Sequence, residues 1–138
     1  MAANTTPIFV KQGNFTPARI NAANSDNSGG GSLIDVVTGT TDGTRVDGIR
    51  FINAGTALLA SAATRINIFH TVGATIRIVG QVLMPAATRS ATVLGATAIY
   101  TFDQAFILKS GEKLSCTSTN WALGTTDNID ACAFAGDY

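Results

Sequence analysis

Residues 64–85 read TRINIFHTVGATIRIVGQVLMP, the longest regular strand pattern in the chain, and the predicted fold is built around them. Apolar and polar residues alternate on both sides of Gly73, a pattern typical of two half-buried strands. Glycine tolerates the positive φ of a tight turn, so residues 72–74 are predicted to join the strands in a hairpin. Pro85 cannot donate to a strand ladder and therefore ends the second strand. The predicted apolar faces carry Ile66, Ile68, His70 and Val72 in the first strand, and Ile76, Ile78, Val82 and Met84 in the second.

The composition indicates one weakly charged domain. The chain has 138 residues, enough to bury a core, and 46% of them are hydrophobic while 13% are charged. Nine basic residues balance nine acidic ones, so we expect neither nucleic acid nor a membrane as a partner. We also expect no membrane span and no secretory signal, because the sequence has neither a long apolar run nor a basic start followed by one. A surface with so few charges protects poorly against association, so we expect partner subunits to cover part of it.

The strands predicted outside the hairpin are short and evenly spaced. They occupy residues 33–39, 45–54, 96–108, 114–119 and 128–135, with a bulge expected at Gly48 and a bend at residues 103–105. With seven to nine strands in all, the sequence predicts an all-β fold, an antiparallel β-sandwich with the central hairpin in the middle of a sheet. A jelly roll is the working topology, although strand count and spacing do not distinguish it from an immunoglobulin-like sandwich or a barrel.

The chain before residue 33 is predicted to lie outside the sandwich. Residues 1–32 form a flexible N-terminal arm and a Gly/Ser/Asn-rich loop, and residues 33–138 form the β-sandwich domain. The apolar run at residues 8–10 is either the first strand of the sheet or a segment that docks on a neighbouring molecule, because termini are ordered mainly when they are tied down. The apolar side chains of this arm are Ile8, Phe9, Val10 and Phe15.

The sequence assembles no catalytic or metal-binding set. The single histidine, His70, shares its face with isoleucines, so packing or hydrogen bonding is favoured over catalysis. The carboxylates mostly flank turns, where they cap their own backbone. A row of arginines is interpreted as a solvated face or as inter-subunit salt bridges rather than a nucleic-acid site, because no aromatic residues interleave with it. We therefore expect no enzyme activity, no cofactor, no metal and no small-molecule substrate. The arginines are Arg50, Arg65, Arg77 and Arg89.

Two cysteines and the one tryptophan lie in the last quarter of the chain. Cys116 and Cys132 would face each other if the last two strands pair about Gly124. We interpret them as small buried hydrophobic residues, with a disulfide as the alternative, because a reducing cytoplasm rarely oxidises facing thiols. Trp121 lies in the loop between those strands. It either covers the end of the sandwich or anchors a contact, since tryptophan is enriched in binding hot spots.

Four segments carry a resemblance when taken in order. They read DGTRVDGIRFINAG (42–55), TRINIFHTVGATIRIVGQVLMPAATRSAT (64–92), LKSGEKLSCTST (108–119) and AFAGDY (133–138). This series resembles a group of small all-β virion proteins from tailed bacteriophages and prophages, over about residues 33–138. Ala135 departs from the group's ending, which is close to GGDY. The matching positions are Asp42, Gly43, Arg45, Arg65, Pro85, Thr88, Gly111, Leu114, Gly136, Asp137 and Tyr138.

The resemblance implies a capsid cement, or decoration, protein. Such a protein is made in the host bacterial cytoplasm and sits on the capsid exterior of the virion, where it bridges neighbouring subunits. Its expected partners are the major capsid protein and copies of itself, as a dimer or trimer. The alternative is a neck, tail or fibre-base module, or a receptor-binding head domain. The expected capsid or inter-subunit contacts are Ile8, Phe9, Val10, Phe15 and Trp121.

Overall fold

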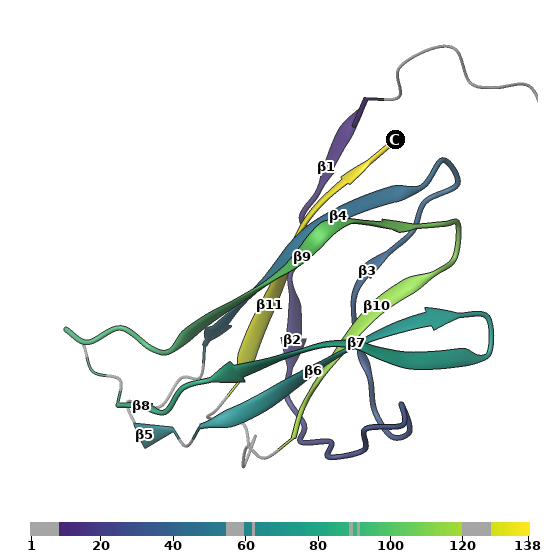
Figure 1. The fold of residues 1–138 in the computed structure, drawn as a ribbon. Coiled ribbons are helices and arrows are strands. Elements are labelled where there is room, and N and C mark those ends of the chain that lie inside the picture. Colours follow the sequence, from purple (N-terminus) through teal and green to yellow (C-terminus); the bar gives the residue numbers. More distant parts are fainter. Residues whose placement is uncertain (1–8, 55–59, 62, 89, 91, 120–127) are drawn as a thin grey trace, which may run out of the picture.

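The computed structural model of the protein describes residues 9–54, 60–61, 63–88, 90, 92–119 and 128–138. Within these ranges the chain is built from strands and loops without a helix. Two antiparallel sheets pack face to face around one core (Figure 1), which confirms the predicted β-sandwich.

The first sheet, here called the arm sheet, holds the strands nearest both termini. β11 lies beside β4, and β4 lies beside β9, which is the far edge. β1 and β2 pair with successive halves of β11 on its other side. The bounds are β1 (Gln12–Asn14), β2 (Ala18–Ile20), β4 (Thr44–Asn53), β9 (Thr97–Leu108) and β11 (Ile129–Asp137).

The second sheet, here called the hairpin sheet, contains the two strands predicted within residues 64–85. Its strands lie in the order β3-β10-β6-β7, and β5 and β8 pair only with each other, as a two-stranded ribbon. The bounds are β3 (Ile34–Thr38), β6 (Thr64–Val72), β7 (Thr75–Met84) and β10 (Lys113–Ser118), with β5 (Ala60–Ser61) and β8 (Ala87–Thr88) in the ribbon.

The predicted hairpin forms, but its place in the sheet differs from the prediction. β6 and β7 pair around Gly73, whose φ of 58° is the left-handed conformation that glycine adopts at no cost. β6 is an inner strand because β10 pairs with its other side, whereas β7 is the edge of the sheet. The expectation that the whole hairpin lies in the middle of a sheet was therefore wrong. Pairing with β10 joins residues about 45 positions apart, and no local pattern encodes it.

A bulge in β7 also corrects the predicted apolar face of that strand. Ile68 pairs with Gly80 while Phe69 pairs with Ile78, so Val79 is an extra residue. Successive side chains of a strand point to opposite sides of the sheet. One extra residue therefore moves every later side chain of the strand to the other side. Ile78 consequently lies on the outer side with Phe69, whereas the later residues Val82 and Met84 lie on the core side with Ile66 and Ile68.

The core lies between the two sheets and consists mainly of branched and aromatic side chains. Tyr100 and Phe106 of β9 pack against it. The ladder between β4 and β9 skips Asp47, next to the bulge predicted at Gly48, and residues 102–105, where a bend was predicted. Complete burial of one such side chain stabilises the fold by about 1.5–3 kcal/mol. The largest fully buried members are Ile20, Val46, Ile49, Phe51, Ile66, Ile68, Met84, Leu108, Leu114 and Ile129.

The loop over residues 21–32 packs on the outer side of the hairpin sheet. The Asn24 amide donates to the Ser118 carbonyl at 2.8 Å. Asn27 Oδ1 accepts from Asn67 Nδ2 at 2.9 Å and from Arg65 Nη2 at 3.1 Å. β6 is therefore covered on both sides, and Asn67 is fully buried with its amide groups hydrogen-bonded.

Two further predictions differ from the structure. The sandwich begins at Gln12 rather than at residue 33, because β1 and β2 pair with β11 and Ile20 is fully buried. Cys116 and Cys132 do not face each other, because β10 and β11 belong to different sheets, and both thiols are free. The proposed turn at Gly124 lies outside the described residues.

Candidate docking site at the N-terminal arm

The arm is tied to the sandwich at its base by backbone pairing. Gln12 and Gly13 of β1 lie opposite Asp137 and Gly136 of β11. The Lys11 amide donates to the Asp137 carbonyl at 2.8 Å, so pairing continues one residue beyond the strand. These bonds fix the backbone at residues 11–14 and leave the side chains before them to be placed by packing.

Two glycines make room for the side chains of the arm. A Cβ built on Gly136 would collide with the Val10 side chain, and one built on Gly13 would collide with the Phe15 ring. Val10 and Phe15 therefore lie directly against backbone on the outer side of the arm sheet. Close approach of this kind is one of the physical uses of glycine within a strand.

An apolar groove of about 400 Å³ lies beside these side chains. Val10, Phe15 and Phe134 line it, and the Arg45–Asp47 ion pair, with Nε 2.9 Å from Oδ1, forms its charged rim. The exposed fractions are 44% for Val10 and 60% for Phe15, and that of Phe9 just before them is 75%. Exposed apolar clusters with a polar rim are typical of interaction sites.

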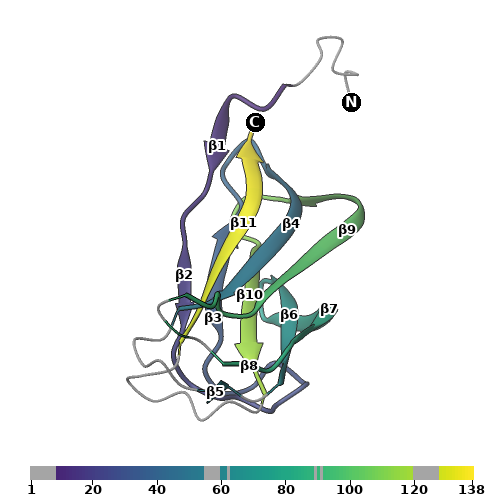
Figure 2. The same ribbon diagram turned by 90° about the vertical axis from the view of Figure 1, so that its left-hand side faces the viewer.

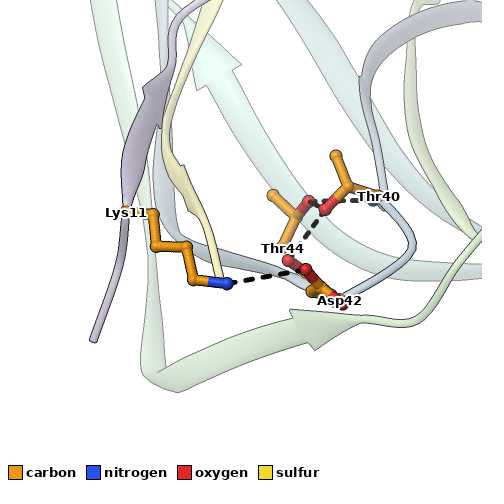
Figure 3. Close-up of polar contacts among 5 residues, drawn as sticks. Lys11, Thr40, Asp42 and Thr44 are labelled. Carbon is orange, nitrogen blue, oxygen red and sulfur yellow. Dashed lines mark hydrogen bonds and ion pairs between the residues drawn. The ribbon is translucent and has the colours of Figure 1, made fainter. Parts of the chain in front are cut away.

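Hydrogen bonds join the turn at residues 40–44 to the C-terminus beneath the arm. Thr44 Oγ1 donates to Asp137 Oδ1 at 2.6 Å, and the Tyr138 amide donates to the Gly43 carbonyl at 3.1 Å. Figure 3 shows Lys11 reaching Asp42 of the same turn, with 3.6 Å between Nζ and Oδ2. The lysine–aspartate pair is largely exposed and contributes at most about 1 kcal/mol, so the hydrogen bonds hold this junction.

The sequence motifs DGTR and GDY thus meet in space. Gly136 lies opposite Arg45, and Asp137 lies opposite Thr44. The φ of 100° at Gly43 explains the glycine of the first motif. The other matching positions lie elsewhere: Leu114 is in the core, and Gly111, with a φ of 79°, is in the turn before β10.

The predicted contact residues have different outcomes. Ile8 and Trp121 lie outside the described residues. Val10 and Phe15 share the groove, while Phe9 and Val10 precede the first strand, so the strand interpretation does not hold for those two positions. The docking interpretation stays a prediction. Phe134 was missed, although an apolar residue among the small residues of AFAGDY is a visible signal.

His70 has the hydrogen-bonding and packing role that was predicted for it. Its Nε2 lies 3.1 Å from Glu112 Oε2, and its ring meets the Phe106 ring edge-on, with 4.9 Å between centroids. A hydrogen bond from the Lys109 amide lowers the pKa of Glu112, and the contact with His70 lowers it further, against the opposing effect of burial. The contacts of His70 with Glu112 and Phe106 hold the turn at residues 109–112 against β6.

Other reactive groups are dispersed. Burial raises the pKa of the Cys116 thiol, which keeps it protonated and unreactive. Among the described residues, no three His, Cys, Asp or Glu side chains gather to hold a metal ion. No helix in the described part of the chain is long and apolar enough to span a bilayer.

Comparison with known proteins gives no assignment for this geometry. No protein-family model matches the chain, and no curated protein matches its sequence. The arm groove and the motifs that meet beneath it are therefore the features from which a function can be inferred.

Proposed function

We propose that this chain is a structural virion protein that binds the outer surface of a bacteriophage capsid and cements neighbouring major capsid subunits. The observation that carries the proposal is the arm, which presents Phe9 and Phe15 with most of their surface in water. Aromatic side chains contribute large contact areas at interfaces. The resemblance to small virion proteins supplies the class of partner.

The resemblance gains support from the place of its motifs. The turn at Asp42 and Gly43 and the ending at Asp137 are 95 residues apart in the chain, and hydrogen bonds join their neighbourhoods directly under the arm. If the two segments together position the arm, motifs of a fixed sequence are expected in both of them.

The strand order also favours the jelly-roll topology. Counting the eight strands β2, β3, β4, β6, β7, β9, β10 and β11, the first pairs with the last, the second with the seventh, the third with the sixth and the fourth with the fifth. This is the pairing of one long hairpin rolled into two sheets. We include the jelly roll in the proposal for this reason.

The mechanism is adhesive and needs no chemical step. Each ring moved from water into a capsid pocket contributes about 2 kcal/mol, or about 30-fold in Kd. One arm therefore binds weakly, and several contacts from one decorating particle multiply the affinity. Neighbouring capsid subunits held by the same particle cannot separate without breaking those contacts.

Co-sedimentation with phage heads tests this function. Heads of the phage that encodes the chain, prepared without the chain, are mixed with wild-type protein and with a Phe9→Ser, Phe15→Ser variant. We expect wild-type protein to pellet with heads and the variant to lose at least about 100-fold in affinity. A matched control, Leu83→Ser with Leu94→Ser, removes two side chains that are 64% and 90% exposed elsewhere on the molecule.

The outcomes separate the candidate roles. Equal pelleting of the variant and the control would refute the arm as the anchor. Wild-type protein that ignores heads but binds tails or host cells would refute the capsid role. It would instead favour the neck, tail, fibre-base or receptor-binding alternative.

A further inference from the structure

β7 forms a long edge of the hairpin sheet and carries little charge. Its ten residues, Thr75–Met84, pair with β6 on one side, and no described strand pairs with the other side. Arg77 is the only charged residue in the strand, while Ile78 and Leu83 are 38% and 64% exposed. Unpaired backbone groups along a long apolar edge are a template for strand addition by other chains. An edge of this kind needs protection.

The other sheet edges are short or interrupted. β1 and β2 have three residues each, with Pro17 between them, and β3 has five. β9 has twelve residues, but residues 102–105 lie outside its ladder with β4 and include Asp103. Proline, charge and short length are common means by which natural sheets discourage pairing at an edge. Of these, β7 has only the single charge of Arg77.

A bulge leaves one carbonyl of β7 for a side chain from the other sheet. Val79 is the extra residue between Ile78 and Gly80, and the extra residue of a bulge is left unpaired in the ladder. The Tyr100 hydroxyl of β9 donates to the Val79 carbonyl at 3.2 Å. Tyr100 therefore occupies an acceptor that an added strand would otherwise use.

Gly80 makes room for this contact. A Cβ built on Gly80 would collide with the end of the Tyr100 ring. The ring is half-buried and meets the Phe102 ring edge-on, with 5.2 Å between centroids. β7 and β9 are in contact, and Figure 2 shows both on the same side of the sandwich, away from β1 and β2. Tyr100 thus joins the edge strand of one sheet to the edge strand of the other.

A second carbonyl of β7 is occupied three residues earlier. Arg77 Nη1 donates to the Ile76 carbonyl at 2.8 Å. A two-residue turn joins Val72 to Thr75, and the pair that closes such a turn is hydrogen-bonded. Bonded and non-bonded pairs alternate along an antiparallel ladder. The next pair, Thr71 with Ile76, therefore leaves the Ile76 carbonyl on the free edge.

We propose that Tyr100 and Arg77 together close the free edge of β7 against strand addition. An added strand gains its affinity from main-chain hydrogen bonds along the edge. Such a strand would have to displace both side chains, and at Tyr100 it would also move a ring that packs against the core. The proposal concerns the edge of the hairpin sheet, so it is independent of the arm groove and of the proposed capsid role.

Thioflavin fluorescence and sedimentation velocity on the purified chain test the proposal. A Tyr100→Phe, Arg77→Ser variant keeps the aromatic ring but removes both donors. Each bond favours the closed arrangement by about fivefold, so the double variant should form thioflavin-binding aggregates about 25-fold faster than wild-type protein. Circular dichroism before incubation establishes that the variant is folded.

A matched control removes the same two groups elsewhere on the molecule. Tyr138→Phe with Arg50→Ser deletes one hydroxyl and one guanidinium at a half-buried and an exposed position. Neither position lies in β7 or β9, so this control should aggregate at the rate of wild-type protein.

A charge placed on β7 distinguishes edge pairing from a general loss of stability. Ile78→Lys, added to the double variant, introduces a lysine at a 38% exposed position of the edge strand. Because lysine on an edge discourages strand addition, aggregation should return to the rate of wild-type protein. Lysine restores neither hydrogen bond, so aggregation caused by lower stability alone would persist.

Two results would overturn the proposal. The first is a double variant that aggregates no faster than the matched control. The second is aggregation that continues unchanged after Ile78→Lys, because it would then arise from another surface. Neither measurement uses phage heads, so each outcome leaves the proposed capsid role to its own test.

Discussion

Replacing Phe69 by alanine separates what local periodicity predicts from what the folded chain does. Phe69 lies on the outer side of β6, opposite Ile78, and alternation along the strand assigns that side to solvent. In the structure its exposed fraction is 0%, because the outer side of the hairpin sheet is covered. We expect Phe69→Ala to behave as a core substitution.

The expected loss can be estimated from this burial. Truncating a fully buried phenylalanine to alanine costs about 3–5 kcal/mol, as lost transfer free energy plus a cavity. The loop over residues 21–32 can partly close the space, so the lower end, about 3 kcal/mol, applies. Domains of this size have a free energy of unfolding of about 5–15 kcal/mol, so the variant should still fold.

Urea unfolding measures the difference. With a slope of about 1.5 kcal/mol per molar, a loss of 3 kcal/mol lowers the midpoint by about 2 M. The control is Leu83→Ala, on the same outer side but 64% exposed, for which we expect less than about 0.5 kcal/mol. Faster hydrogen exchange at the Asn24 amide, which bonds to Ser118, should accompany the Phe69 change. Equal midpoints for the two variants would refute the claim that this side is a second buried layer.

The remaining predictions concern the titratable groups. Glu112 has a lowered pKa in the folded chain, so its stabilising effect is complete above the unfolded value of about 4.3 and is lost as the pH falls through the lower folded value. Glu112→Gln should therefore flatten the fall in urea midpoint below pH 4.3, and an unchanged pH profile would contradict this. Of the two free cysteines, Cys132 is partly exposed and should react with a thiol reagent in the dilute native chain, whereas the buried Cys116 should react only after unfolding. Modification of both thiols at equal rates would contradict this burial.

The local sequence pattern predicted those elements of the fold that depend on side-chain alternation and turn chemistry over a few residues. Gly73 and its flanking strands, the bulge at Gly48 and the bend at residues 103–105 all depend on neighbours in sequence. The role of His70 followed from its parity, which places it on the core side beside Phe106. The arm side chains Val10 and Phe15 were also singled out from the sequence, in a segment that was expected either to form the first strand or to dock on a neighbouring molecule.

Period-two alternation is a property of consecutive residues, so the all-β sandwich, its turns and most of its core could be predicted without a structure. The identity of neighbouring strands became known only from the folded chain. It placed β7 at an edge, separated Cys116 from Cys132, brought Ile20 into the core and joined the turn at Gly43 to the C-terminus. It also decided which outer side is covered and which leaves Ile99 exposed. These outcomes depend on contacts between residues far apart in the chain. The free energy of each contact depends on both segments, so neither segment alone predicts it.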